Sequence, residues 1–260
     1  MCGINGITKT DNKVIQEMNT AIQHRGPDDQ GLFSDKHTTF GHVRLSIIDL
    51  SRAGHQPMHY SKKIGACSEK HEKANISKTK YTITFNGEIY NFLEIKKELL
   101  QKGFEFTTKT DTEVILAAYE AWGKDCVKKF NGMWAFAIYD KKKKEIFLSR
   151  DRLGIKPLYY FIDKEKIIFS SEIKGLLTSK IPRRVNNNIL ADFLRYNIYH
   201  HTQETFFINI QRLLPGHNAI YNLEEKHFFI EHYYKLKSTK ENKNLKETFF
   251  ESIQRRLIAD

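Results

Sequence analysis

The sequence predicts an α+β fold, built from many short apolar strands and a smaller number of amphipathic helices. Stretches that alternate apolar and polar side chains recur along the chain, as expected for strands with one buried face. Between them, apolar residues three and four positions apart indicate helices. Hydrophobic residues make up 40% of the 260 residues and charged residues 28%, so the chain can bury a sizeable core and is not expected to be disordered.

The first half of the chain is predicted to alternate between strands and helices. Val14, Met18 and Ile22 have helical spacing, and Gly26 and Pro27 then end the helix. The expected strands are residues 3–8, 39–47 and 81–85, and the expected helices are residues 12–23, 91–102 and 112–122.

Two short signals mark the ends of these elements. Asn86-Gly87 is a turn signal that ends the strand at 81–85. Asp111 is the expected N-cap of the helix that starts at residue 112. From Tyr60 to Lys80 the chain turns to Lys, Ser, Glu and His with few apolar residues, so this segment is expected to be an exposed and mobile insertion.

The second half is predicted to be mainly strands. They are expected at residues 132–139, 145–150, 157–162, 166–170, 204–210, 217–222 and 227–235, with one helix at 188–198. Residues 236–244 are polar and are interpreted as a linker. After it, an apolar stripe at helical spacing is formed by Leu245, Phe249, Phe250, Ile253, Leu257 and Ile258. Such a stripe must be covered, either by this domain or by a second domain that the chain does not include.

The charge pattern does not favour nucleic acid as a partner. The net charge is +11 and the pI near 9.4, but the lysines are scattered. The one dense run, Lys141 to Lys144, lies between two apolar stretches and is interpreted as a hairpin turn. Zinc-finger spacing and RNA-recognition signatures are absent from the sequence, so a nucleic-acid-binding protein remains a rival supported by charge alone.

Cysteine usage and hydropathy indicate a cytoplasmic protein. The three cysteines, at positions 2, 67 and 126, are sparse and odd in number. This argues against a disulfide framework and indicates a reducing compartment. Cys67 is interpreted as a loop thiol and Cys126 as a helix thiol. The N-terminus lacks the apolar run of a signal peptide. No segment approaches the roughly 18 apolar residues of a membrane helix, so no membrane partner is expected.

Cys2 is a candidate nucleophile, although a structural cysteine is the simpler interpretation of the residue alone. If Met1 is removed, a thiol and a free α-amino group share one residue. Their reference pKa values, about 8.5 and about 7.7–8.0, lie close to neutral pH. The amine could then act as the general base for its own thiol, which is the arrangement of N-terminal-nucleophile hydrolases.

Six motifs occur in an order that is typical of one family. They are MCGINGI at residues 1–7, HRGPDDQG at 24–31, RLSIIDL at 44–50, NGEIYN at 86–91, TDTEVIL at 110–116 and RDRLGIKPLYY at 150–160. From Cys2 to about Tyr234 the chain closely resembles the glutaminase domain of glutamine-hydrolysing asparagine synthetases, which are class II amidotransferases. The resemblance implies a four-layer α/β/β/α N-terminal-nucleophile sandwich of two antiparallel sheets.

The resemblance also implies roles for individual residues. Cys2 would attack the side-chain amide of L-glutamine, and Asn86 with Gly87 would form the oxyanion hole. Arg44 would hold the α-carboxylate, for which a planar guanidinium is well suited. Glu88 and Asp111 would hold the ammonium end, and the pocket would also be lined by the backbone of Leu45, Ser46, Ile47 and Ile48.

Each of these residues also has a simpler interpretation. Arg44 could form a surface ion pair, Asn86-Gly87 could be an ordinary hairpin turn, and the carboxylates could be capping or solvated. His24 and Arg25 are expected to be structural, satisfying carbonyls or pairing with an acid such as Asp28. No metal ligands are predicted.

The resemblance predicts a glutaminase domain at residues 1–235, followed at 236–260 by a linker and the first helix of a truncated synthetase domain. The sequence contains no Gly-Gly pair, so the family's phosphate-binding Ser-Gly-Gly loop is missing. We therefore expect glutamine hydrolysis without a cofactor, whereas ATP and Mg²⁺ would serve only the missing C-terminal ATP-pyrophosphatase domain. Another ammonia acceptor (a sugar or peptide), a non-catalytic regulatory module and a homodimer all stay open.

Overall fold

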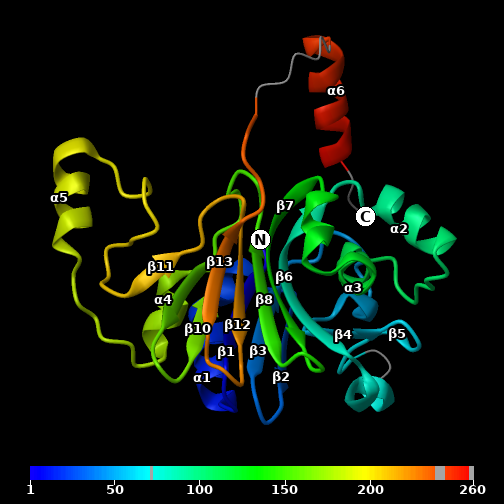
Figure 1. The fold of residues 1–260 in the computed structure, drawn as a ribbon, viewed down its shortest axis with the longest axis horizontal. Helices are drawn as coiled ribbons and strands as arrows, with labels where there is room; N and C mark the ends of the chain where they lie inside the picture. The colour runs from blue at the N-terminus through cyan, green and yellow to red at the C-terminus, as the bar shows by residue number, and fades with distance from the viewer. Residues whose placement is uncertain (71–72, 238–243, 258–260) are drawn as a thin grey trace.

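A computed structural model describes residues 1–70, 73–237 and 244–257. Two antiparallel β-sheets lie face to face, and helices cover their outer faces (Figure 1). The predicted α+β sandwich of two antiparallel sheets is therefore confirmed. In the described part of the chain, no helix is both long and apolar enough to cross a membrane.

The first sheet has six strands in the order β11-β9-β10-β1-β3-β2. All neighbouring strands are antiparallel, and β1 pairs with both β10 and β3. Cys2 directly precedes β1, so it lies where this interior strand begins, at one end of the sheet. The strands are β1 Gly3–Ile7, β2 Asp29–Ser34, β3 Thr39–Arg44, β9 Tyr159–Ile162, β10 Ile167–Ser170 and β11 Ile210–Arg212.

The second sheet has seven strands in the order β13-β12-β8-β7-β6-β4-β5, again all antiparallel. Its two longest strands, β6 and β7, lie side by side, and a turn at the predicted position, residues 141–144, joins β7 to β8. The strands are β4 Met58–Ser61, β5 Gly65–Cys67, β6 Tyr81–Ile89, β7 Gly132–Asp140, β8 Glu145–Arg150, β12 His217–Asn222 and β13 Phe228–His232.

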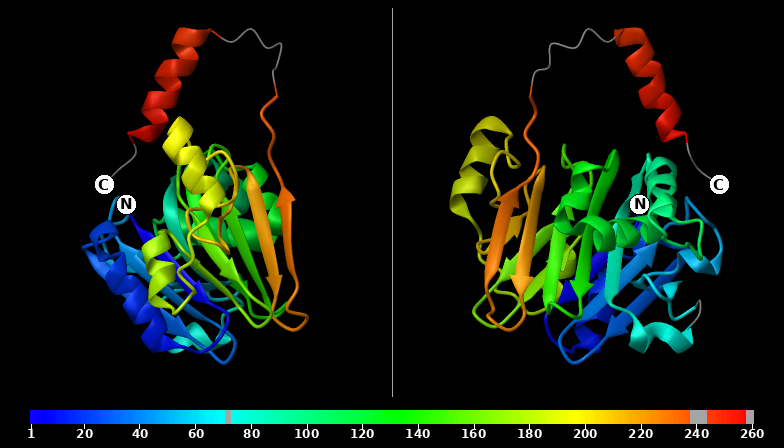
Figure 2. Two further views of the ribbon diagram at one scale, coloured as in Figure 1. Left: turned by 90° about the vertical axis from the view of Figure 1, so that its left-hand side faces the viewer. Right: turned by 45° about the vertical axis from the view of Figure 1, so that its right-hand side comes forward.

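Each sheet carries two helices on its outer face. Helices α1 (Asn12–Ala21) and α4 (Ile173–Thr178) pack together on the first sheet, while α2 (Phe92–Gln101) and α3 (Asp111–Trp122) pack on the second. Helix α5 (Asn187–Tyr196) lies at one side of the sandwich in Figure 1 and in the right-hand view of Figure 2. Helix α6 (Leu245–Arg256) stands away from the sheets, beyond the ends of the strands.

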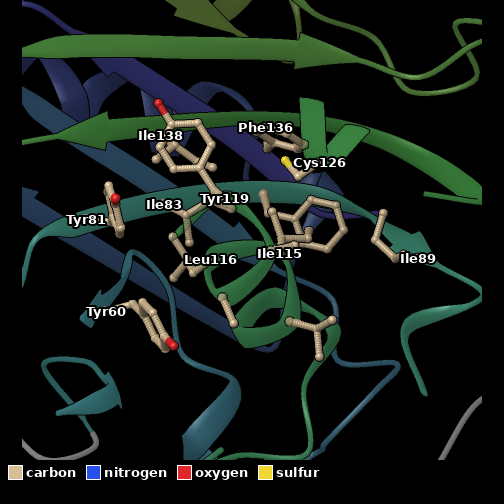
Figure 3. Packing of buried hydrophobic residues seen from close by; sticks show 14 of the residues in the cluster. Tyr60, Tyr81, Ile83, Ile89, Ile115, Leu116, Tyr119, Cys126, Phe136 and Ile138 are labelled. Atoms are coloured by element: carbon tan, nitrogen blue, oxygen red, sulfur yellow. The ribbon is translucent and has the colours of Figure 1, made fainter. Parts of the chain in front are cut away.

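The alternation of side chains along β7 divides the hydrophobic core into layers. Ala135, Ala137 and Tyr139 point between the two sheets. Trp134, Phe136 and Ile138 point the other way, toward α2 and α3. Figure 3 shows this second layer, in which Ile115, Leu116 and Tyr119 of α3 meet Ile83, Phe136 and Ile138 of the second sheet. A strand buried on both faces reads as a continuous apolar run, as MWAFAIYD does.

The segment from Tyr60 to Lys80 contradicts the sequence-based expectation of an exposed insertion. Its first part forms most of the β4–β5 hairpin, and Tyr60, Ala66 and Cys67 are buried. Cys67 is therefore a buried strand residue, whereas Cys126 is a helix thiol as predicted, in a short 3-10 helix. Strands this short leave too few alternating residues to be recognised among polar neighbours. Residues 71–72 lie outside the described part.

Other boundaries differ where local signals were weak. Strand β2 and helix α4 were not predicted. The turn-forming residues Pro27 and Asp28 come directly before β2, and the polar residues 170–172 come directly before the short helix α4, so neither start has a clear periodic signal. The predicted strand at 204–210 is reduced to isolated bridges before β11. The strand expected at 39–47 ends at Arg44, and the chain then leaves the sheet to form a loop beside Cys2.

Helix α6 carries its apolar side chains on the surface. Leu245, Phe249, Phe250 and Ile253 are all exposed, and the described helix buries no residue. Its contact with the sandwich runs through Arg255, which pairs with Glu94 of α2 at 2.8 Å, and through Arg256, which lies over the ring of Tyr90. Exposed ion pairs contribute little to stability. Residues 238–243 of the expected linker, and Ile258 of the stripe, lie outside the described residues.

We predict that the backbone amides of α6 exchange with solvent much faster than those of α3. A helix of this length is marginal unless packing stabilises it, and α6 buries none of its side chains. Hydrogen exchange followed by mass spectrometry on this chain would measure the difference, with α3, whose first nine residues are buried, as the internal reference. Strong protection across residues 245–257 would contradict the prediction.

Candidate active site

A pocket of about 510 Å³, its open mouth included, lies beside Cys2 at the end of β1. Five chain segments converge there: the N-terminus, the loop after β3, the end of β6, the start of α3 and the loop between β8 and β9. Ten residues were predicted for the site, and nine of them line this pocket. They are Cys2, Arg44, Leu45, Ile47, Ile48, Asn86, Gly87, Glu88 and Asp111.

The tenth residue, Ser46, does not line the pocket. Its backbone N–H donates to the Asp28 carboxylate at 2.7 Å, which holds the loop after β3 against the segment after α1. The backbone of this loop therefore reaches the pocket at Leu45, Ile47 and Ile48. The described residues contain no cluster of His, Cys, Asp and Glu side chains that could hold a metal ion.

Cys2 presents a half-buried thiol to the pocket. Its Sγ atom lies 3.4 Å from both the backbone N and the backbone O of Leu45. Burial raises the pKa of the Cys2 thiol, while the Leu45 N–H and the charge of Arg44 act in the opposite direction. Met1 is attached to Cys2 in this structure, and burial lowers the pKa of its terminal amine. The N-terminal amine and the thiol therefore share one partly desolvated corner.

Arg25 fixes the main chain at Cys2. Its Nε–H donates to the Cys2 carbonyl at 2.9 Å, and its Nη1 donates to Glu172 at 2.9 Å. His24 also pairs with Glu172, at 2.9 Å. The structural role predicted for this pair therefore agrees with their contacts, but their acid is Glu172 instead of Asp28.

Arg44 is buried and organises the loop around the pocket. Its guanidinium donates to the backbone carbonyls of Ser51, at 2.9 Å, and of Asp49. Gly54 leaves room for it, since a Cβ atom there would come within 2.0 Å of Nη2. In the described structure no carboxylate pairs with Arg44, so the surface ion pair considered from the sequence is not formed. The guanidinium is a buried cation in the pocket wall.

Asn86 and Gly87 lie inside a strand, not in a hairpin turn. Strand β6 continues to Ile89, and Gly87 pairs with Trp134 of β7. The expected strand end at Phe85 is therefore wrong. Both polar atoms of the Asn86 side chain are buried and have no hydrogen-bond partner among the described residues. Buried amides without partners are rare, and one that lines a pocket is available to a ligand.

Asp111 is a buried carboxyl at the start of α3. It accepts a hydrogen bond from the Ile89 N–H at 3.0 Å, so it ties α3 to the end of β6. Burial raises the pKa of Asp111 to about 7, and the nearby charge of Glu88 adds to the rise. The N-cap of α3 is Thr110, whose hydroxyl accepts from the Glu113 N–H, so the capping role expected for Asp111 is wrong.

Sequence reasoning missed several residues of the pocket wall: Gly54, Gln56, Phe85, Thr110, Thr112 and Lys156. Gln56 bridges two walls, since its Oε1 accepts from the Phe85 N–H at 2.7 Å and its Nε2 donates to Thr112 at 3.3 Å. No sequence spacing connects Gln56 to either partner. Lys156, in contrast, lies within RDRLGIKPLYY, a motif that was noticed without a role for any of its residues.

The first two residues of that motif hold the loop between β8 and β9. The Asp151 carboxylate accepts from the backbone N–H groups of Trp134, Leu153, Ile155 and Lys156 at 2.9–3.2 Å. Arg150 donates to the backbone carbonyls of Gly154, Lys156 and Leu213 at 2.6–2.8 Å. Two charged side chains thus satisfy most of this loop's backbone and fix where Lys156 lies.

Comparison with known proteins places the chain among amidotransferases. A family model described as "Glutamine amidotransferase domain" matches residues 1–234. A Methanocaldococcus jannaschii protein named "Putative asparagine synthetase (glutamine-hydrolyzing) 2" is 42% identical over all of this chain and 53% of its own length. Glutamine-hydrolyzing asparagine synthetase 3 of Bacillus subtilis is 32% identical over all of this chain and 42% of its own length. The chain thus spans about half the length of these relatives.

Two further similarities are informative. The Gibberella zeae protein named amidase chry2 is 32% identical over 99% of this chain and 37% of its own length. Among solved structures, the glutamine phosphoribosylpyrophosphate amidotransferase of B. subtilis matches with a TM-score of 0.62 and 18% identity, over 90% of this chain and 50% of that one. The structural match supports the fold.

We predict that Asp111→Asn flattens the pH dependence of stability between about pH 4 and pH 7. Because burial raises the folded-state pKa of Asp111 to about 7 from 3.8, its contribution is fully present below the unfolded pKa and is lost as pH rises through about 7. As the pH rises across this range, the free energy of unfolding of the variant should increase by on the order of 2–4 kcal/mol relative to that of the parent. Urea unfolding at several pH values measures it, with Asp163→Asn as the control at an exposed turn. A gain that does not change with pH would contradict the prediction.

Proposed function

The chain belongs to the glutamine amidotransferase domain family, and on that premise we propose that it hydrolyses L-glutamine to L-glutamate and ammonia through a thioester on Cys2. The observation that carries the proposal is the convergence of Cys2, Asn86, Arg44 and Asp111 on one pocket. These are a nucleophile, a buried amide without a partner, a cation and a buried carboxyl. A non-catalytic module on the same fold would have no need for all four in one place.

The reaction begins with the thiol of Cys2. Once Met1 is removed, the α-amine of Cys2 takes the thiol proton, and Sγ attacks the side-chain amide carbon of glutamine. The Asn86 amide and the Gly87 N–H stabilise the oxyanion that forms. The protonated amine then gives its proton to the leaving ammonia. Water attacks the γ-glutamyl thioester, glutamate leaves and the thiol is restored.

The two ends of glutamine meet opposite charges in the wall. Arg44 receives the α-carboxylate, and the α-ammonium lies by Asp111 and Glu88. Burial raises the pKa of both carboxyls, and the substrate's positive charge would favour their ionised forms. Gly87 keeps the strand close to its partner, since a Cβ there would come within 2.1 Å of the Met133 carbonyl.

The ammonia is proposed to serve asparagine synthesis from aspartate. The support is that two relatives, of which this chain covers 53% and 42%, are named asparagine synthetases. Activation of aspartate would require ATP and Mg²⁺ in a further domain, which residues 236–260 would begin, after the glutaminase domain at 1–235. This chain alone should neither consume ATP nor make asparagine. An acceptor other than aspartate is the second candidate, because a relative that matches 99% of this chain is named an amidase and not an asparagine synthetase.

We predict that Asn86→Ala and Arg44→Lys change different kinetic constants. Loss of the Asn86 donor should lower kcat about 100- to 1000-fold with little change in glutamine binding, because the donor acts mainly on the transition state. Arg44→Lys should mainly raise KM, because an ammonium cannot reproduce the two-point contact of a guanidinium with a carboxylate. Steady-state assays of ammonia release measure both constants.

Cys2→Ala is the matched control, since it should abolish hydrolysis while glutamine still binds. An Asn86→Ala variant with full kcat, together with an Arg44→Lys variant that loses only kcat, would contradict the assigned roles. If the processed parent chain released no ammonia from glutamine, the proposed function itself would fail.

A further inference from the structure

Lys156 is a largely buried lysine in the wall of the Cys2 pocket, and its ammonium keeps some access to the pocket. The residue is 4% exposed, and it lies on the loop between β8 and β9, where it lines the pocket together with Met1 and Cys2. Among the described residues, its Nζ has no hydrogen-bond or ion-pair partner within contact distance. A buried lysine is normally paired, because removing an ammonium from water is costly. An unpaired one that faces a reactive thiol therefore calls for a functional explanation.

The loop that carries Lys156 is held rigidly. Its backbone is fixed by the four hydrogen bonds that Asp151 accepts and the three that Arg150 donates. Gly154 adopts a φ of +68°, and a Cβ there would come within 2.7 Å of Pro215. The backbone of Lys156 thus participates in this network at both its N–H and its carbonyl. The position of the ammonium is built into the fold.

The charges near Lys156 act in both directions on its pKa, which burial lowers overall. Burial lowers the pKa of Lys156, while Glu88, Cys2 and Asp151 raise it and Arg25 lowers it further. The terminal amine of Met1, one residue before the nitrogen of Cys2, is surrounded by a related set of charges. After burial, which lowers its pKa most, Arg25 and Lys156 also lower it, whereas Cys2 and Asp28 raise it. Glu172 balances Arg25 directly, through their ion pair at 2.9 Å. In the described pocket wall Arg44 and Lys156 both lack an acid at contact distance, but Arg44 is bound to the carbonyls of Ser51 and Asp49. Of the two cations, only Lys156 is among the charges that act on the terminal amine.

We propose that Lys156 is a positioning residue that keeps the α-amine of processed Cys2 in its neutral form, ready to accept the thiol proton. The inference rests on the proposed function, in which that amine is the general base. A protonated amine cannot take the proton, so an adjacent buried cation increases the fraction of enzyme that is competent at neutral pH. Arg25 supplies a similar charge but is committed to Glu172.

The same cation bears on the proton transfer itself. Moving the proton from thiol to amine creates a thiolate and an ammonium, and Lys156 favours the first and disfavours the second. The two effects oppose each other in that step. The effect of Lys156 on the pKa of the amine in the resting enzyme is not opposed in this way. It should therefore set the pH below which activity is lost.

The test compares four processed chains that begin at Cys2: the parent, Lys156→Met, Lys156→Arg and the surface control Lys142→Met. Two readouts are followed against pH. One is kcat/KM for glutamine, and the other is acetylation of the α-amine by acetic anhydride, measured by mass spectrometry of the N-terminal peptide. The second needs no turnover.

Removing the cation raises the pKa of the amine, so Lys156→Met should move both curves to higher pH. Near pH 6 its kcat/KM, relative to its own alkaline plateau, should fall about threefold to tenfold below the parent, since each pKa unit is a factor of ten. Lys156→Arg should keep the parent's curves, and Lys142→Met should not change them. If Lys156→Met does not fold, Lys156→Gln takes its place.

Unchanged curves in a folded Lys156→Met or Lys156→Gln variant would overturn the inference while leaving the proposed function intact. So would a Lys156→Arg variant that shifts as far as Lys156→Met, because shape and not charge would then be responsible. If the parent showed no glutaminase activity, the proposed function would fail, and the acetylation curves would still decide whether Lys156 controls the amine.

Discussion

The antiparallel pairing of β6 with β7 is the constraint on which the site depends. The register of Gly87 with Trp134 places Asn86 in the pocket wall and keeps it there without a hydrogen-bond partner. Two residues further along β6, the Ile89 N–H binds Asp111 and so sets the start of α3. On the other strand, the Trp134 N–H binds Asp151 and so sets the loop that carries Lys156. One strand pair thus positions three walls.

Buried carboxylates serve two different purposes around this strand pair. Asp151 and Glu113 are surrounded by donors, and Glu113 accepts from the backbone of Ala66, Thr107 and Thr108. They replace backbone hydrogen bonds in irregular segments and have little left to offer a ligand. Asp111 lines the pocket, and its burial, which the hydrogen bond from the Ile89 N–H offsets only in part, raises its pKa to about 7. A cation that enters the pocket would supply the positive charge that stabilises the ionised form of Asp111.

The sequence was sufficient where a motif and a period agreed. The two central strands β7 and β8 were predicted to within a residue, and nine of the ten predicted site residues meet in one pocket. It was insufficient where long-range pairing decides the local structure. Asn86-Gly87 has the composition of a turn, but the partner strand β7 keeps it extended. Ser46 lies within the RLSIIDL motif, but its N–H donates to Asp28. Gln56 joins the pocket wall through bonds to Phe85 and Thr112, which no sequence spacing connects to it.

The central claim is that Cys2 carries a covalent γ-glutamyl intermediate. The direct measurement is the intact mass of the processed chain, quenched in acid during turnover of L-glutamine, followed by peptide mapping. The account predicts an added mass of one γ-glutamyl group on the Cys2 peptide, absent from Cys2→Ala and lost on treatment with hydroxylamine, which cleaves thioesters. Undiminished ammonia release by Cys2→Ala, or an adduct that maps to Cys67 or Cys126, would contradict it.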